Sequence, residues 1–256
     1  CTKLLYEYLG DLIVLDVGGA TTDLHSVTVE SDQVARLMIS PEPKAKRTVE
    51  GDLGVYVNRW KVVESIGEEK LREQCREQGF SMEHALETYR AIPKTEEEVK
   101  LVELLTREAV VKAAERHAGR LRYIYGPSGR STVAEGKDLT QVKYIVGTGG
   151  ALTRLPHREE IMREITRCNE SGMLLLPGEH AQILVDHDYI MASLGVLSKR
   201  YPQAAARLLE QSLGMTFPER KAEEPVPVCN KELSRLETQR QQREEELQRH
   251  IEECEA

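Results

Sequence analysis

The stretch Leu-Ile-Val-Leu-Asp-Val-Gly-Gly-Ala-Thr-Thr-Asp, residues 12–23, decides the fold that we predict for this chain. Its apolar start, residues 12–15, is typical of a buried strand, which delivers Asp16 to the glycine pair Gly18 and Gly19. Because glycine has no Cβ, the backbone there can approach a ligand closely. Such a turn can offer N–H groups and hydroxyls to phosphate oxygens, and an acid at the end of the strand can hold Mg²⁺ through water. A hairpin with two turn glycines is the alternative, and this stretch alone does not separate the two.

A second glycine turn follows another short apolar strand. Residues 142–146 lead into Gly-Thr-Gly-Gly-Ala-Leu at 147–152 and then into a predicted helix. A dinucleotide-binding fingerprint would need a glycine at the sixth position, where Leu152 stands, so an oxidoreductase is disfavoured. Gly149 and Gly150 would instead let the backbone lie flat against the base and ribose of a nucleotide.

The two turns, in this order, resemble the phosphate-2 and adenosine motifs of the actin, Hsp70 and sugar-kinase ATPase superfamily. Residues 48–54 lie where Hsp70-like members carry a Gly-Gly-Glu-Asp segment, and residues 186–195 are similar to the second connecting helix of the superfamily. Within the superfamily, residues 16–27, 48–54 and 136–150 look like the glutamate-mutase-associated MutL/GlmL family. The resemblance extends over roughly residues 8 to 215.

This resemblance implies an α/β fold, namely one ribonuclease-H-like lobe of the superfamily ATPase with a helical insert and a charged helical or disordered C-terminal tail. It implies an ATP-dependent, chaperone-like accessory protein that reactivates an adenosylcobalamin-dependent aminomutase such as glutamate mutase by promoting release of damaged cobalamin. The partners would be the aminomutase subunits and the nucleotide. Cobalamin would bind only to the client enzyme, because this chain has no Asp-x-His-x-x-Gly signature.

The resemblance also assigns residues to a site for Mg²⁺ and ATP or ADP. Asp16 is the expected catalytic and metal-holding acid. Gly51 and Asp52 are expected near the nucleotide, although Asp52 fits the N-cap of a following helix equally well. Gly18, Gly19, Thr21 and Thr22 are expected to contact the phosphates, and Gly149 and Gly150 the adenosine. Asp23 and Gly147 are also expected to belong to the nucleotide site.

Periodicity divides the chain into four parts. Residues 1–66 would form the first part of the lobe, 67–119 a helical insert, 120–216 the remainder of the lobe, and 217–256 a linker with a charged tail. In the first part, alternation over 22–39 predicts a β-hairpin with its turn at 30–32, followed by a polar loop at 41–47. Apolar residues three to four apart over 51–66 predict a helix that begins near Asp52.

Two further elements have clear local signals. Thr95 and Glu98 have the spacing of a capping box at the start of a helix in the insert. Residues 121–125 predict a strand that ends at a Gly-Pro-Ser-Gly turn, residues 126–129.

Composition excludes several classes of protein. The 256 residues carry a net charge of -8 and only 5% aromatic side chains, which disfavours nucleic acid and anionic membranes as partners. No apolar run could cross a bilayer, so we expect a cytoplasmic protein. Five scattered cysteines without Cys-x-x-Cys, and seven dispersed histidines, predict neither disulfides nor zinc. His25 and Ser26 would point to opposite faces of a strand, so they cannot form a nucleophile–base pair.

The chain begins with Cys1 and reaches the phosphate-2 motif at once, without the Asp-Gly-Thr turn of the first lobe. We therefore interpret it as the C-terminal half of a longer protein and expect ATPase activity only from that protein, since half of the phosphate clamp is missing. Two alternatives stay open: a small-molecule kinase of the same superfamily, and a degenerate, nucleotide-insensitive interaction module.

Overall fold

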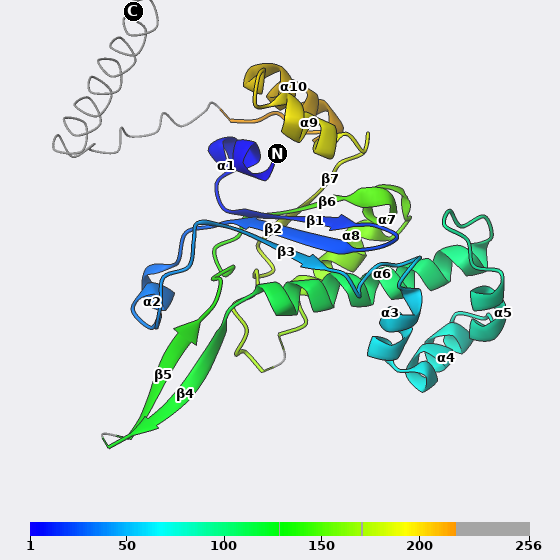
Figure 1. Ribbon diagram of the computed structural model, residues 1–256, viewed down its shortest axis with the longest axis horizontal. Coiled ribbons are helices and arrows are strands. Elements are labelled where there is room, and N and C mark those ends of the chain that lie inside the picture. The colour runs from blue at the N-terminus through cyan, green and yellow to red at the C-terminus, as the bar shows by residue number, and fades with distance from the viewer. Residues whose placement is uncertain (128, 170, 219–256) are drawn as a thin grey trace, which may run out of the picture. The chain divides into compact units, whose positions relative to one another are not determined.

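The computed structural model describes residues 1–127, 129–169 and 171–218, all within the first of two compact units of the chain, Cys1–Glu219 (Figure 1). The predicted linker and tail, 217–256, lie outside the described residues except for Phe217 and Pro218. No helix in the described part is long and apolar enough to cross a membrane.

The predicted strand at residues 12–15 forms the centre of a five-stranded mixed sheet. β1 (Leu12–Val17) pairs antiparallel with β2 (Thr22–Val27) and parallel with β6 (Tyr144–Thr148). β3 (Ala45–Glu50) extends the sheet beyond β2 in antiparallel register, and β7 (Gln182–Val185) extends it beyond β6 in parallel register. The strand order is β3-β2-β1-β6-β7, and the predicted α/β class is confirmed.

Apolar side chains of β1 point alternately to the two faces of the sheet, which are both covered. Leu12 and Val14 pack in one cluster and Ile13, Leu15 and Val17 in another, as the two-residue period of a strand requires. A strand buried on both sides reads as a continuous apolar run, which explains the sequence pattern at residues 12–15.

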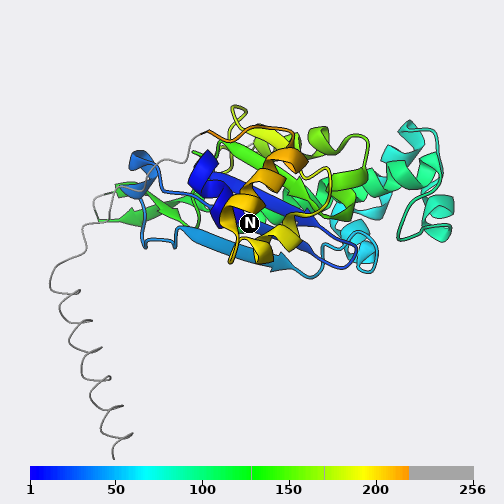
Figure 2. The same cartoon turned by 90° about the horizontal axis from the view of Figure 1, so that it is seen from above.

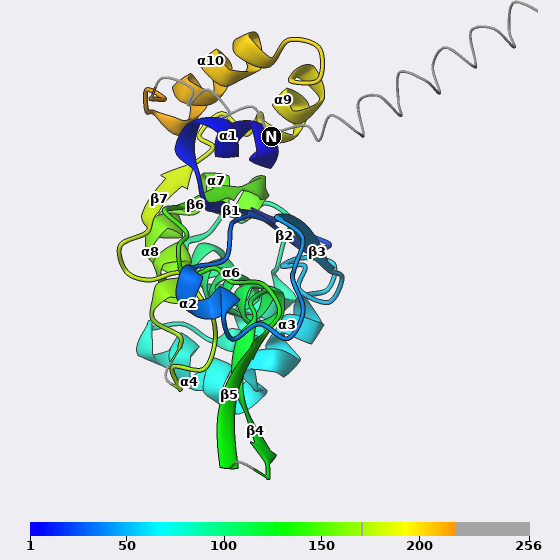
Figure 3. The same cartoon turned by 90° about the vertical axis from the view of Figure 1, so that its left-hand side faces the viewer.

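Helices form a layer on each face of the sheet, as Figure 3 shows. On the Leu12 face lie α1 (Thr2–Leu9), α9 (Met191–Leu197) and α10 (Pro202–Leu213). On the Ile13 face lie α6 (Glu96–His117), α7 (Gly149–Arg154), α8 (Arg158–Arg163) and the 3₁₀ turn η1 (Glu164–Thr166). The carboxyl ends of β1 and β6, which lead into the two glycine-rich segments, therefore lie between two layers of helices.

A group of helices between β3 and β4 lies at one end of the molecule (Figure 2). α3 (Arg59–Ile66), α4 (Glu68–Glu77) and α5 (Met82–Glu87) pack beside the long helix α6. The capping box predicted at its start is confirmed: Thr95 Oγ1 accepts from Glu98 N at 3.2 Å, and Glu98 Oε2 accepts from Thr95 N at 3.2 Å.

A two-stranded arm projects from the body at the other end (Figures 1 and 3). It consists of β4 (Arg120–Gly126) and β5 (Gly129–Glu135), paired antiparallel. The predicted strand at 121–125 is confirmed by β4.

The predicted hairpin over 22–39 is wrong beyond residue 27. Ser31 instead caps the short helix α2 (Asp32–Ala35), with its Oγ accepting from Val34 N at 3.3 Å. On the side away from β1, β2 pairs with β3, which begins at Ala45 within the predicted loop. Alternation indicates a strand but does not identify its neighbour, and Ile39 donates to Ala134 O in the arm instead.

The predicted helix over 51–66 is wrong in its first half, because α3 begins at Arg59. Residues 54–58 are held by hydrogen bonds to the first glycine turn, which a helix at this position could not make. Leu53 and Val55 of this irregular segment are buried, whereas Val57 is 62% exposed, so the apolar spacing here does not mark one face of a helix.

Candidate functional site

Asp16 stands at the end of β1, between Asp23 of β2 and Thr148 of β6 in the strand register. Its side chain is partly buried. No described residue donates a hydrogen bond to its carboxylate or forms an ion pair with it. An unpaired, partly buried carboxylate is uncommon, because burial penalises the charge unless a partner compensates it.

The surroundings of Asp16 are rich in negative charge. Desolvation raises the pKa of the Asp16 carboxyl above its usual value, and the carboxylates of Asp23 and Asp186 raise it further, while Arg47 acts in the opposite direction. A divalent cation beside Asp16 would relieve this repulsion. The described residues contain no group of three or more His, Cys, Asp or Glu side chains that could hold a metal ion directly. Asp16 is the carboxylate that could hold Mg²⁺ here, and it would do so through water.

Thr148 and Asp186 are neighbours of Asp16. Thr148 pairs with Asp16 in the strand register, and the Asp186 carboxylate acts on Asp16 electrostatically. Asp186 is fully buried, and its carboxylate accepts from Thr148 Oγ1 at 2.8 Å, Ser212 Oγ at 2.5 Å and Met191 N at 2.9 Å. Both carboxylate oxygens of Asp186 therefore accept hydrogen bonds from the protein. Asp16 is the neighbouring carboxylate that stays available to a ligand.

The first glycine turn presents free amides beside Asp16. Gly18 N donates to Thr21 O at 2.9 Å, which closes the turn. The N–H groups of Gly19, Ala20 and Thr21 have no acceptor among the described residues, and Gly19 and Ala20 are exposed. Consecutive free N–H groups at a turn form a concave site for an anion such as phosphate.

The carbonyl side of this turn is held by residues 54–58. Tyr56 N and Val57 N donate to Gly19 O at 2.8 and 2.7 Å. Asn58 Nδ2 donates to Ala20 O and to Gly51 O, both at 2.7 Å. The Gly54 backbone lies so close that a Cβ there would fall 2.2 Å from the Ala20 carbonyl, so only glycine fits. The turn is thus held rigidly while its N–H groups stay free.

The second glycine turn, predicted over residues 147–152, is wrong as a turn: β6 continues to Thr148, and α7 begins at Gly149, directly against β1. Gly149 is buried with a φ of 86°, and a Cβ there would lie 2.5 Å from Asp16 Oδ1 and 2.6 Å from Val17 N. Gly150 is exposed, and a Cβ there would meet nothing within 4 Å. The parallel pairing of β1 with β6 therefore brings Asp16 and Gly149 together from positions far apart in the sequence.

Residues 1–213 of this chain match the MutL protein family. The chain is also 36% identical over 211 residues to Protein MutL of Clostridium tetanomorphum, an alignment that covers 80% of this chain and 46% of that protein. This chain belongs to the MutL family. It spans about half the length of the curated relative that it matches.

Not every residue predicted for the site of this MutL family member faces the same space. Thr22 is fully buried, and its Oγ1 donates to Leu53 O at 2.7 Å, so it points into the core. Asp23 is held by Arg47, whose Nη2 lies 2.7 Å from Asp23 Oδ1. Thr21 Oγ1 donates to Asp23 Oδ2 at 3.3 Å and is partly exposed. Gly147 lies inside β6, where a Cβ would fall 2.5 Å from Met162 Sδ, so this glycine serves packing.

Gly51 and Asp52 lie at an exposed turn. Arg116 of α6 binds both Asp52 carboxylate oxygens at 2.8 and 2.9 Å and Glu50 Oε2 at 2.7 Å. The side-chain hydrogen bond from Arg116 lowers the pKa of the Asp52 carboxyl. Asp52 is not the N-cap of α3, since that helix begins seven residues later.

Sequence reasoning did not predict the contacts by which three residues hold this part of the MutL fold: Arg47 with Asp23, Asn58 with Ala20 and Gly51, and Arg116 with Glu50 and Asp52. Each acts on a residue distant in sequence, so no local motif reveals it. The alternation of the strands gives a partial sequence signal for Arg47. This residue of β3 pairs with His25 of β2, and it is therefore diagonal to Asp23 on the same face of the sheet.

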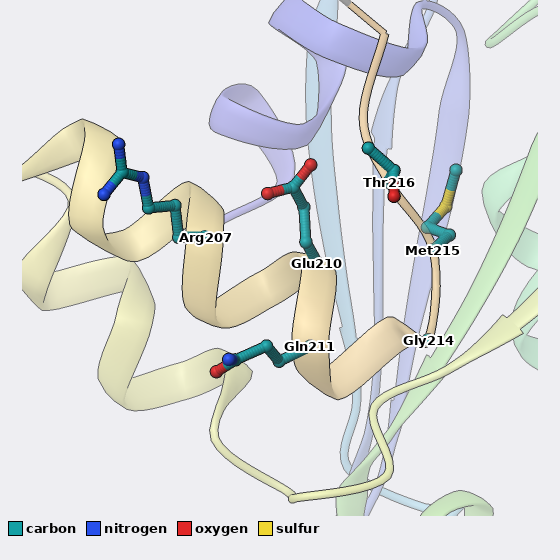
Figure 4. Close-up of a pocket in the computed structure, with 6 residues that line it drawn as sticks. All are labelled: Arg207, Glu210, Gln211, Gly214, Met215 and Thr216. Atoms are coloured by element: carbon teal, nitrogen blue, oxygen red, sulfur yellow. The ribbon is translucent and has the colours of Figure 1, made fainter.

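A cavity of about 560 Å³ lies at the C-terminal end of α10, lined by residues such as Arg207, Glu210 and Thr216 (Figure 4). None of the predicted site residues lines it. Glu210 Oε1 already accepts from Phe217 N at 2.6 Å, so the acid in this cavity holds the local chain.

Proposed function

We propose that this chain forms one ribonuclease-H-like, nucleotide-binding lobe of an actin/Hsp70/sugar-kinase type ATPase. The observation that carries the proposal is the unpaired Asp16 carboxylate, which lies between a turn with free N–H groups and the Gly149 backbone. The strand order β3-β2-β1-β6-β7, with three antiparallel strands followed by two parallel additions, supports the same fold.

Each part of the site would have a distinct role toward Mg-ATP or Mg-ADP. Asp16 would orient Mg²⁺ through water and act as the acid of the catalytic centre. The N–H groups of Gly19, Ala20 and Thr21, together with the Thr21 hydroxyl, would bind phosphate oxygens. Gly150, exposed and without neighbours around a Cβ, would leave the adenosine room to lie against the backbone.

We further propose that the whole protein is an accessory protein that reactivates an adenosylcobalamin-dependent aminomutase such as glutamate mutase. Family membership supports this role. The chain aligns with 46% of its relative, and we propose that a segment like the remainder of that relative supplies the other half of the phosphate clamp. Nucleotide-driven motion of the two lobes would then release damaged cobalamin from the client enzyme. A cytoplasmic location stays a prediction from composition.

Calorimetry of Mg-ADP and Mg-ATP binding tests the nucleotide site. It should compare this chain with a version that includes the upstream half of the relative, each as wild type, Asp16→Asn and Gly150→Ala. We expect the extended protein to bind and both substitutions to weaken binding. If neither form binds at millimolar nucleotide, the glycine-rich segments have only a structural role in the fold, and the chain is an interaction module.

Cobalamin exchange tests the client. The extended protein, ATP and a purified aminomutase carrying hydroxocobalamin should release that cobalamin, and Asp16→Asn should abolish the release. Nucleotide binding without exchange on any aminomutase would reject the reactivating role. ATP turnover that requires a sugar or carboxylate acceptor would identify a small-molecule kinase instead.

A further inference from the structure

The arm formed by β4 and β5 exposes aromatic and aliphatic side chains far from the candidate site. Tyr123, Ile124 and Tyr125 are 48, 50 and 79% exposed. Tyr and Arg are the residues that most often dominate binding energy at protein interfaces. Side chains of this kind at the tip of a projecting hairpin indicate a contact surface.

The arm is built to be held at its base and free at its tip. At the base, Ala134 N donates to Leu37 O and Leu121 N to Met173 O, both at 2.7 Å, and Ala134 packs in a small buried cluster with Val34 and Leu175. Toward the tip no such packing exists among the described residues. An isolated two-stranded ribbon is only marginally stable in water, which favours a tip that gains a partner.

One face of the tip combines aromatic rings with a cation. Tyr123 and Tyr125 are two residues apart on β4 and share a face, and Arg130 stands opposite Tyr125 on β5. The Arg130 guanidinium lies 4.4 Å from the centre of the Tyr123 ring. Residues 120–135 contain three arginines and one glutamate, within a chain of net charge -8. The arm therefore suits an acidic partner surface with an apolar centre.

Such a surface exists at the other end of the same molecule. A cavity of about 350 Å³ lies among α3, α4 and α5, and we call it the Trp60 pocket. Its apolar lining includes Val63, Met82 and Leu86 together with Trp60, which is 54% exposed.

Acidic side chains surround the apolar part of the Trp60 pocket. Glu83 is bound by Arg72, whose Nε lies 2.7 Å from Glu83 Oε1. Glu68 and Glu87 also line the pocket, and neither makes a hydrogen bond or an ion pair with another described residue. Arg72 also lines the pocket and interacts electrostatically with Glu68, so the lining holds three carboxylates and one cation and is acidic overall.

We propose that the arm tip of one copy of this protein binds the Trp60 pocket of a second copy. Tyr125 would enter the apolar part of the pocket, and Arg130 would face Glu68 and Glu87. Within the described residues, the arm and α3–α5 lie on opposite sides of the sheet and its helices (Figure 1), so the contact joins separate copies. It is head-to-tail and leaves an arm and a pocket free at the two ends of each assembly. A contact made by one hairpin tip is small, so the association is weak and transient.

Sedimentation velocity on the full 256-residue chain across a concentration series tests this inference. We expect wild type to self-associate reversibly and less strongly at high salt, and Tyr125→Ala to weaken association by at least about tenfold. The pocket variant Glu68→Lys/Glu87→Lys should behave in the same way. Arg130→Glu, which places a carboxylate opposite the acidic pocket, should weaken association as well. Arg207→Glu, an exposed charge reversal on α10, is its matched control and should associate as wild type.

Mixing gives the sharpest result. Tyr125→Ala retains an intact pocket and Glu68→Lys/Glu87→Lys retains an intact arm, so the mixture should form a dimer that does not grow further. Asp16→Asn should assemble as wild type, which separates this inference from the nucleotide site. A wild type that stays monomeric at every concentration overturns the proposal, and so do variants that each self-associate on their own as strongly as wild type. So does a single-stranded oligonucleotide that binds wild type but not Arg130→Glu, which would assign the arm to nucleic acid.

Discussion

Replacing Gly149 by alanine should strongly destabilise the sheet at the candidate site. The added Cβ would lie 2.5 Å from Asp16 Oδ1 and 2.6 Å from both the N and O atoms of Val17. Contacts this short force the backbone of β1 and the start of α7 apart. The residue also has a φ of 86°, a conformation that L-residues adopt only at a cost.

The two effects set the magnitude. A side chain in the left-handed region costs about 1–2 kcal/mol. Overpacking a close contact costs typically about 1–3 kcal/mol. Their sum is about 2–5 kcal/mol, and its centre near 3.5 kcal/mol corresponds to a fall in Tm of roughly 7–14 °C for a domain of this size.

Gly150→Ala is the matched control, one residue along the chain. A Cβ there meets nothing within 4 Å and the residue is exposed. Alanine also favours a helix over glycine by up to about 1 kcal/mol, so the Tm should stay constant or rise slightly. Thermal and urea unfolding of both variants, followed by circular dichroism, measures the difference. If Gly149→Ala unfolds within about 2 °C of Gly150→Ala, the close approach of β1 and α7 is wrong.

Three further predictions concern buried or bonded groups. His117 is buried between Ser26 Oγ at 2.7 Å and Thr48 Oγ1 at 2.8 Å, and desolvation lowers its pKa to about 3. As pH falls below about 6.5 the unfolded chain takes up this proton first, so the free energy of unfolding should fall by up to about 1.4 kcal/mol per pH unit. Urea titrations between pH 6.5 and 5 should show this slope in wild type but not in His117→Gln, and equal slopes would reject a neutral buried imidazole. Burial raises the pKa of Asp16, so without nucleotide the charge of this carboxylate opposes folding at neutral pH. Scanning calorimetry should therefore show that Asp16→Asn raises the Tm at pH 7 but not at pH 3. A lower Tm of the variant at pH 7 would show that the Asp16 carboxylate has a stabilising partner. Asn58→Ala removes two hydrogen bonds at 2.7 Å and should lower the free energy of unfolding in urea by about 1–2 kcal/mol. Asn58→Asp should lower it by as much, because a carboxylate cannot donate a hydrogen bond. An unchanged stability of Asn58→Asp would contradict the role of Asn58 in holding Ala20 and Gly51.

Local sequence was sufficient wherever the signal lay within a few residues. The apolar run at 12–15 predicted β1, the spacing of Thr95 and Glu98 predicted the start of α6, and the Gly-Pro-Ser-Gly turn predicted the end of β4. In each case the cause is local, since burial on both faces, end-capping and turn formation act on neighbouring residues. The first glycine turn was recognised for the same reason, whereas residues 147–152 form the end of β6 and the start of α7.

Only the tertiary structure decided which residues meet. Alternation at 34–39 could not show that β2 pairs with Ala45–Glu50, because a strand pattern contains no record of its neighbour. Thr22 and Thr21 are adjacent and chemically alike, yet one is buried against Leu53 and the other lies at the turn with free N–H groups. The lone Asp16 carboxylate is likewise a property of the assembled sheet, since Asp23 is bound by Arg47 and Asp186 by Thr148 and Ser212. The sequence by itself determined the strands and the turns, whereas long-range pairing determined which polar groups are satisfied and which stay free for a ligand.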